Sequence, residues 1–279
     1  MSYTAEISRM NPTCFLFLID QSGSMGDAFP ETSRKKAENV ADAINRLLQN
    51  LVIRSSKSEG VRDYFNVSVI GYGSNTGPAF SGELAGKEQV PISQVAINPA
   101  RIVERTKKVE DGAGGLVDQT IKFPVWFDPT SNGGTPMCQA METAHRILST
   151  WLSQHPDCFP PIVIHITDGE STDGDPTEAM QRLVRLASND GNVLLFNVHL
   201  SSNPDSKPVE FPAPPVELPD RYARMLFDHA SALTPYMVSV ARSDYQLKLS
   251  DGAKGFVLNA DPILVVTALD IGTRTPTLR

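Results

Sequence analysis

Apolar residues form several short uninterrupted runs along the chain, with polar residues only at the ends of each run. The clearest run is Thr13–Asp20, which is apolar from Cys14 to Ile19. An uninterrupted run of this length is expected of a strand that is covered on both faces, as in a parallel sheet. Further strands are predicted at Phe65–Tyr72, 161–167, 192–200 and 255–258.

Between these strands, apolar residues recur at spacings of three and four, which gives a helix one apolar stripe. In the predicted helix 33–53 the stripe consists of Ala37, Val40, Ala41, Ile44, Leu47, Leu48 and Leu51. The charged residues expected on its solvent side are Arg34, Lys35, Lys36, Glu38 and Asp42. Further helices are predicted at Met137–Gln154, 176–189, 220–232, 235–242 and 261–269, with a loop at 203–219. This alternation predicts a Rossmann-like α/β fold, a doubly wound and mostly parallel sheet flanked by helices.

Residues 74–129 lack a sustained period, and we expect an elaborated insertion that packs on the sheet. The elements predicted within it are short strands at 79–84 and Ile92–Ile97, a short helix at 101–109 and a flexible turn at 111–115. The segment 121–127 is apolar, but Pro124 bars it from a central ladder position because proline lacks the N–H donor. Its aromatic residues, Phe123, Trp126 and Phe127, fit either the core or an exposed contact patch. The whole chain, 1–279, is expected to form one domain with this insertion and a C-terminal helical extension at 220–279.

Composition describes an ordinary soluble globular protein, with 41% apolar and 20% charged residues among 279. The net charge of −7 argues against a general binder of nucleic acid or of anionic membranes. The three cysteines, Cys14, Cys138 and Cys158, form neither a disulfide framework nor a zinc pattern, which suits a reducing compartment. Without a visible signal peptide or a membrane-length apolar run, we expect a cytoplasmic protein with no membrane partner.

Candidate chemistry collects at the ends of two predicted strands. Asp20 ends the first strand and is followed by the hydroxyls of Ser22 and Ser24, and Asp168 follows the strand at 161–167. Thr135 adds a hydroxyl on a tight turn after two glycines. Ligands of doubly wound sheets bind beyond the carboxyl ends of the strands, where these residues are expected. An oxygen-only set suits a hard cation, so we predict a Mg²⁺ or Mn²⁺ site with no catalytic residues.

Three segments together resemble the metal-ion-dependent adhesion site of von Willebrand factor type A (VWA) domains: 20–25 (DQSGSM), 134–136 (GTP) and 167–169 (TDG). The resemblance implies a Rossmann-like fold and five metal ligands, which are Asp20, Ser22, Ser24, Thr135 and Asp168. It implies that the two serines bind the ion directly, that the aspartates act largely through water, and that Thr135 does either. The chain is most similar to bacterial intracellular members of the tellurite-resistance type, which implies a Ser/Thr kinase or a protein phosphatase as partner.

The predicted function is therefore a non-enzymatic adaptor for signalling or stress response, whose bound metal captures an Asp or Glu of a partner protein. One alternative is a structural or substrate-presenting subunit of an ATPase- or chelatase-type assembly. The other is a Mg²⁺-dependent phosphotransfer enzyme with Asp20 as nucleophile, which is disfavoured because no lysine ends an apolar strand near Asp168. Nearby acidic residues are expected to be solvated loop charges, with a second cation as the open alternative: Asp27, Glu170, Asp173 and Asp175. His165, inside an apolar strand, is expected to be packed and not catalytic.

Overall fold

The computed structural model describes residues 2–28, 33–110, 115–200, 208–274 and 278, and it has a mostly parallel sheet at its centre. The five parallel strands, in spatial order, are β4 (Phe65–Tyr72), β1 (Thr13–Asp20), β9 (Ile162–Thr167), β12 (Leu194–His199) and β14 (Phe256–Leu258). Antiparallel strands complete both edges: β5 (Thr76–Pro78) and β6 (Val90–Pro91) on β4, and β13 (Val209–Glu210) on β14. The predicted α/β class is confirmed.

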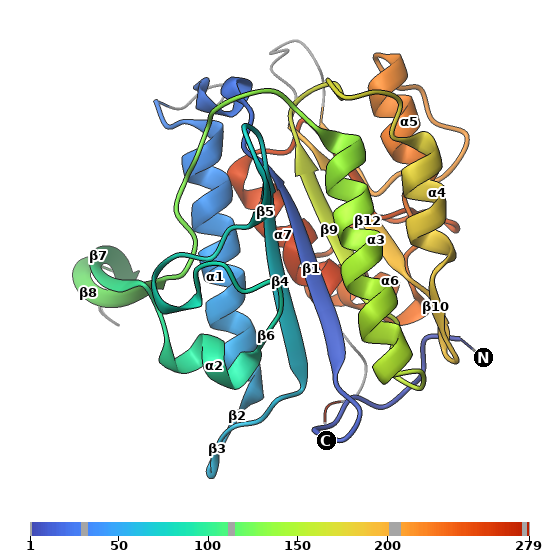
Figure 1. The fold of residues 1–279 in the computed structure, drawn as a ribbon. Helices are drawn as coiled ribbons and strands as arrows, with labels where there is room; N and C mark the ends of the chain where they lie inside the picture. The colour runs from blue at the N-terminus through green and yellow to red at the C-terminus, as the bar shows by residue number, and fades with distance from the viewer. Residues whose placement is uncertain (1, 29–32, 111–114, 201–207, 275–277, 279) are drawn as a thin grey trace.

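The strand order reverses between β1 and β9. The chain passes from β1 to β4 on one side, and every later parallel strand is added on the other side. In open α/β sheets this reversal opens a crevice at the carboxyl ends of the strands, where ligands bind. The carboxyl end of β1 is toward the top of Figure 1, where the chain continues into the short 3-10 helix η1 (Gly23–Gly26).

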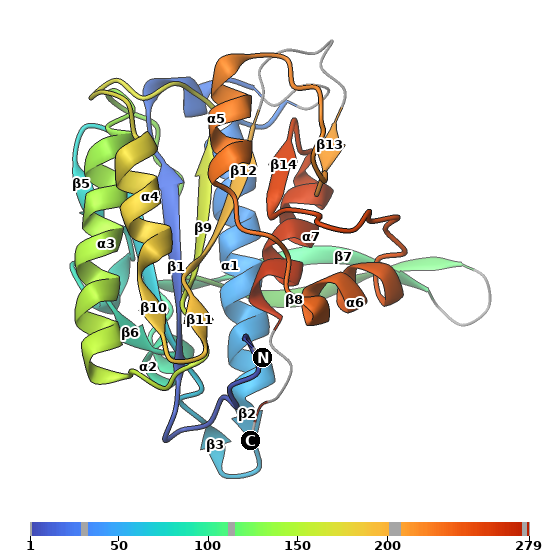
Figure 2. The ribbon, with the colours of Figure 1, turned by 90° about the vertical axis from the view of Figure 1, so that its right-hand side faces the viewer.

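Helices cover both faces of the sheet, as Figure 2 shows. On one face lie α3 (Met137–Gln154), α4 (Thr177–Arg185) and α5 (Arg221–His229), which share a buried apolar cluster with Leu16 and Leu18 of β1. On the other lie α1 (Lys36–Ser55), α6 (Pro235–Ser243) and α7 (Pro262–Thr273), which share a second buried apolar cluster with Phe15 and Phe17. Because alternate residues of β1 enter two cores, nearly every position of the strand must be apolar.

Several predicted elements in 74–129 are wrong. Ile92–Ile97 is helix α2 and not a strand, with Ile92 and Val95 buried at helical spacing. The predicted helix at 101–109 is strand β7 (Arg101–Glu110), paired antiparallel with β8 (Leu116–Val125). The predicted strand at 79–84 ends in a 3-10 turn, η2 (Gly82–Leu84). Local propensity was overridden because cross-strand pairing over ten residues stabilises β7 as a strand.

The β7–β8 hairpin forms a separate two-stranded sheet and projects from the body (Figure 2). Its position agrees with the exclusion of Pro124 from the central ladder, because Pro124 lies in β8. At the base of the hairpin, Phe123, Trp126 and Phe127 are at most 3% exposed, so these aromatics belong to the core. Of the predicted turn at 111–115, residues 111–114 lie outside the described part of the chain.

The remaining elements differ from prediction mainly at their ends. The predicted helix 176–189 stops at Arg185, because a small hairpin follows, made of β10 (Ala187–Ser188) and β11 (Gly191–Asn192). A second small hairpin, β2 (Ser56–Lys57) with β3 (Gly60–Val61), follows α1. The predicted loop at 203–219 contains the short strand β13. Among the described residues, no helix combines the length and apolarity needed to cross a membrane.

Candidate metal centre

The predicted ligands from three segments meet at the carboxyl edge of β1 and β9. The Ser24 hydroxyl donates to Asp168 Oδ1 at 2.7 Å, and Ser22 Oγ lies 3.0 Å from Ser24 Oγ. The hydroxyls of Thr135 and Ser24 both lie close to Gly169, the residue after Asp168. A Cβ atom added to Gly169 would lie 3.9 Å from Thr135 Oγ1 and 4.0 Å from Ser24 Oγ. The sequence prediction that these side chains converge is in agreement with this geometry.

Asp20 lies beneath the hydroxyls and is held by two hydrogen bonds. Its Oδ1 accepts from the Ser22 backbone N–H at 2.8 Å, and its Oδ2 accepts from the Thr167 hydroxyl at 2.7 Å. Asp20 is only 1% exposed. Burial raises the pKa of this carboxyl to about 6, against the lowering effect of the hydrogen bonds from Ser22 and Thr167. Such a carboxylate is costly to bury without a nearby cation.

The turn that carries Thr135 is fixed by interlocking backbone segments. Gly133 O accepts from Gly23 N–H at 3.0 Å, which ties the turn to the serine loop. Gly133 has φ of +85°, and a Cβ there would lie 2.4 Å from Ser74 N, so only glycine fits. On the other side, Thr135 N–H donates to the Thr172 hydroxyl oxygen, and Thr172 N–H donates to Thr135 O, each at 2.9 Å.

The donor set fits a small hard cation. Mg²⁺ prefers octahedral oxygen ligands at about 2.1 Å, so neighbouring ligands lie about 3.0 Å apart. The Ser22 and Ser24 hydroxyl oxygens are separated by 3.0 Å. Among the described residues no group of three or more His, Cys, Asp or Glu side chains could hold a metal ion.

Sequence reasoning missed one residue of this site, Lys36. Its Nζ lies 2.7 Å from Asp168 Oδ2, and the exposed fractions of the two side chains are 1% and 0%. The prediction that Lys36 faces solvent is wrong. Lys36 is the first residue of α1, and it precedes Val40 by four positions and Ile44 by eight, so it continues the buried stripe of the helix. That spacing was the available signal.

A buried chain of polar side chains joins residues of the three strands β4, β9 and β12. Asn197 Nδ2 donates to Leu226 O at 2.7 Å, so its Oδ1 accepts from His165 Nδ1–H at 2.9 Å. His165 Nε2 then accepts from the Tyr72 hydroxyl at 2.6 Å. Burial lowers the pKa of His165 to about 4, which keeps the ring neutral. The expectation that His165 is packed is confirmed.

Two of the nearby acidic residues cap the starts of helices. Asp173 accepts from the backbone N–H groups of Cys138 and Gln139 at the start of α3, at 3.0 and 2.9 Å. Asp175 accepts from Thr177 N–H at the start of α4, at 3.0 Å. Both carboxyls have a lowered pKa, with hydrogen bonds favouring the charged form. These contacts account for both charges without a second cation.

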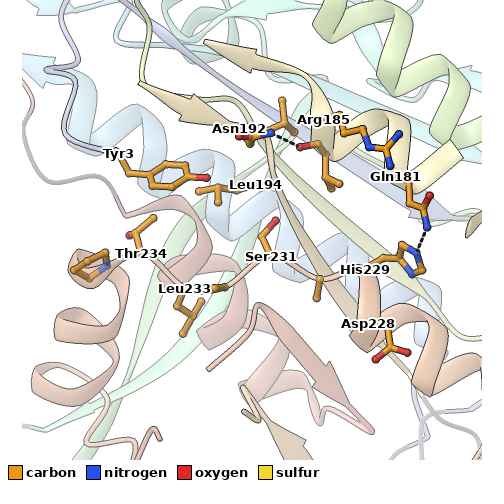
Figure 3. Close-up of a pocket in the computed structure, with 15 residues that line it drawn as sticks. Tyr3, Gln181, Arg185, Asn192, Leu194, Asp228, His229, Ser231, Leu233 and Thr234 are labelled. Carbon is orange, nitrogen blue, oxygen red and sulfur yellow. Dashed lines mark hydrogen bonds between the residues drawn. The ribbon is translucent and has the colours of Figure 1, made fainter. Parts of the chain in front are cut away.

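A separate cavity of about 660 Å³ lies at the opposite edge of the sheet (Figure 3). It reaches Leu194, the first residue of β12, whereas the candidate metal centre lies at the far ends of the strands. Gln181 and His229 face each other at one end of it, 3.4 Å apart. None of the five predicted ligands lines this cavity.

No protein-family model and no curated protein sequence matches the chain. Several solved structures are similar to it. The vWF domain of the type V pili tip protein Mfa5 from Porphyromonas gingivalis has a TM-score of 0.32 and 15% identity, covering 58% of this chain and 39% of that chain. The pilus adhesin SpaC from Lactobacillus rhamnosus GG has a TM-score of 0.43 and 14% identity, covering 94% and 31%. The PilB minor pilin from Streptococcus sanguinis has a TM-score of 0.45 and 9% identity, covering 94% and 61%.

The chain therefore spans less than two thirds of the length of each of these proteins. TM-scores this low do not establish a relationship. The α/β class rests on the strand order and the two helical layers, and the metal centre rests on the side-chain geometry of this chain.

Proposed function

We propose that this protein is a VWA-type binding module, in which a divalent cation held by Ser22, Ser24, Thr135, Asp20 and Asp168 captures an acidic side chain of a partner protein. The bound Mg²⁺ or Mn²⁺ would supply an electrophilic centre for that carboxylate. The partner we propose is a Ser/Thr kinase or a protein phosphatase of a bacterial signalling or stress response in the cytoplasm.

The single observation that carries the proposal is the continuous contact from Ser22 to Ser24 to Asp168. Its two steps are 3.0 and 2.7 Å, and the second step joins residues that are 144 positions apart in sequence. Ser24 is exposed while Ser22 and Thr135 are buried, so the cluster opens to solvent at Ser24. An outside carboxylate can reach a cation at that opening.

The state of Asp20 favours binding over phosphotransfer. A phosphoaspartyl nucleophile needs a free carboxylate oxygen that faces the substrate. Both oxygens of Asp20 accept hydrogen bonds, and the residue is 1% exposed. Lys36 does lie near Asp168, but its ammonium is engaged by that carboxylate.

Metal binding is tested by calorimetric titration of Mn²⁺ into the wild type, Ser22→Ala/Ser24→Ala and Asp168→Asn. We expect binding to the wild type and its loss in both variants. The matched control is Glu170→Gln, which removes an exposed acid two positions from Asp168 and should bind Mn²⁺ as the wild type does. Equal Mn²⁺ affinity in all four proteins contradicts the proposal.

Partner capture is tested by affinity purification with the tagged wild type and Ser22→Ala/Ser24→Ala, each with Mg²⁺ and with EDTA. Proteins held by the wild type in Mg²⁺ and lost in the other three samples are the expected ligands. Recovery of an ATPase in this set favours the alternative function as a subunit of an ATPase- or chelatase-type assembly. A partner that is retained in EDTA and by the variant contradicts metal-dependent capture.

A further inference from the structure

Lys36 gives the candidate metal centre a buried positive charge of its own. The two oxygens of Asp168 are divided between the site and this lysine: Oδ1 accepts from Ser24, and Oδ2 pairs with Lys36 Nζ, each at 2.7 Å. Neither charged side chain is more than 1% exposed. Solvent therefore screens this charge less than it would screen a surface lysine.

Fold stability alone gives little reason for such a pair. Replacing a buried ion pair by apolar groups of similar size is often neutral or stabilising, because both charges must be desolvated. Lys36 occupies a buried position of α1, where it is the only buried charged residue among the described ones. The placement of its ammonium on one oxygen of a predicted metal ligand suits a role at the site.

We infer that Lys36 weakens metal binding by the empty centre and makes the metal-loaded centre selective for an anionic ligand. The inference rests on the proposed function. Two carboxylates, of Asp20 and Asp168, and one ammonium, of Lys36, sum to one net negative charge. A divalent cation then leaves one positive charge in excess, whereas without the lysine the loaded centre would be neutral.

An outside carboxylate removes this excess charge. The cation and the partner's acid group therefore stabilise each other, and by linkage each raises the affinity of the other by the same factor. With a neutral residue at position 36 the metal binds more tightly alone, and the added carboxylate contributes less. Lys36 thus acts as a specificity-determining residue, because it couples metal binding to the arrival of an acidic ligand.

The test measures Mn²⁺ affinity from the free-ion electron paramagnetic resonance signal, with Mn²⁺ alone and with acetate replacing chloride at equal ionic strength. The proteins are the wild type, Lys36→Met, Lys36→Gln and Lys36→Arg. Lys35→Met is the matched control, because Lys35 is exposed and its loss changes the net charge equally. We expect Lys36→Met and Lys36→Gln to bind Mn²⁺ at least about tenfold more tightly than the wild type, since a buried like charge is removed.

Lys36→Arg and Lys35→Met should stay within about threefold of the wild type, since both keep the buried charge. Acetate should tighten Mn²⁺ binding to the wild type, and by a smaller factor in Lys36→Met. Circular dichroism reports folding in each sample, and a neutral variant that is unfolded alone but folds with Mn²⁺ supports the inference. Because Lys36→Gln keeps a donor for Asp168, it measures the effect of charge if Lys36→Met does not fold.

Two results overturn the inference. If the wild type binds Mn²⁺ and the folded neutral variants bind it no more tightly, Lys36 does not set the affinity, while the proposed function stands. If neither the wild type nor any variant binds Mn²⁺, the proposed metal centre fails and the inference fails with it.

Discussion

The buried chain of Tyr72, His165 and Asn197 predicts how stability depends on pH. His165 has a pKa of about 4 in the folded protein, below its value of about 6.5 in an unfolded chain. The unfolded state therefore binds more protons between these values, and folding stability falls as the pH is lowered through this window. His165 contributes its full share of stability above about pH 6.5 and loses it progressively as the pH falls toward 4.

The size of the effect follows from the two pKa values. Between about pH 7 and pH 5, the contribution of His165 to the free energy of unfolding should decrease by about 2 kcal/mol. Asp20 has a pKa raised to about 6 and acts in the opposite direction, because the folded state binds its proton more readily. The contribution of the histidine must therefore be isolated by comparing two proteins.

Urea unfolding of the wild type and His165→Asn, at about pH 7 and pH 5, provides that comparison. Other titrating groups contribute equally to both proteins and cancel in the difference. We expect the wild type to lose about 2 kcal/mol more than His165→Asn on acidification. Equal losses in the two proteins, or an imidazole that titrates near 6.5 in nuclear magnetic resonance spectra of the folded wild type, would refute the reasoning.

Two further predictions concern a buried hydrogen-bond acceptor of α1 and the turn that carries Thr135. Asn45→Ala should lower the free energy of unfolding by about 2–4 kcal/mol in urea titrations. The reason is that Asn45 Oδ1 accepts hydrogen bonds from the buried N–H groups of Trp126 and Phe127. The control Asn50→Ala, on the exposed side of α1, should lower it by less than about 1 kcal/mol. A similar loss in both variants contradicts the role of Asn45. Gly133→Ala should weaken Mn²⁺ binding at least about tenfold in calorimetry, because Gly133 has a positive φ and an added Cβ would clash with Ser74. The control Gly77→Ala should leave Mn²⁺ binding unchanged, because no atom lies within 4 Å of the added Cβ. Unchanged Mn²⁺ affinity in Gly133→Ala would show that the turn does not position Thr135.

Much of the fold could be predicted from the sequence where one periodic pattern dominates. The bounds predicted for Thr13–Asp20, Phe65–Tyr72 and Met137–Gln154 agree with β1, β4 and α3. Asp20 and Asp168 were expected at one edge because parallel strands bring their carboxyl ends together there, and the full set of five predicted ligands came from the resemblance to VWA adhesion sites. These features depend on local patterns that burial on both faces of the sheet reinforces.

The remaining features depend on tertiary contacts that outweigh the preference of the residue type. Strand β7 is rich in charged residues and is fixed as a strand by its pairing with β8. Lys36 is charged, so residue type alone placed it in solvent, yet Asp168 stabilises it in the core. Both cases are decided by a tertiary partner, which overrides the preference of the residue itself.

The central claim is that one divalent cation binds among the hydroxyls of Ser22, Ser24 and Thr135 and the carboxylates of Asp20 and Asp168. Anomalous diffraction from a crystal soaked in Mn²⁺ tests this claim most directly. We predict one anomalous peak within bonding distance of the Ser22 and Ser24 hydroxyl oxygens. Ordered density for both serine side chains with no anomalous peak beside them would contradict the claim.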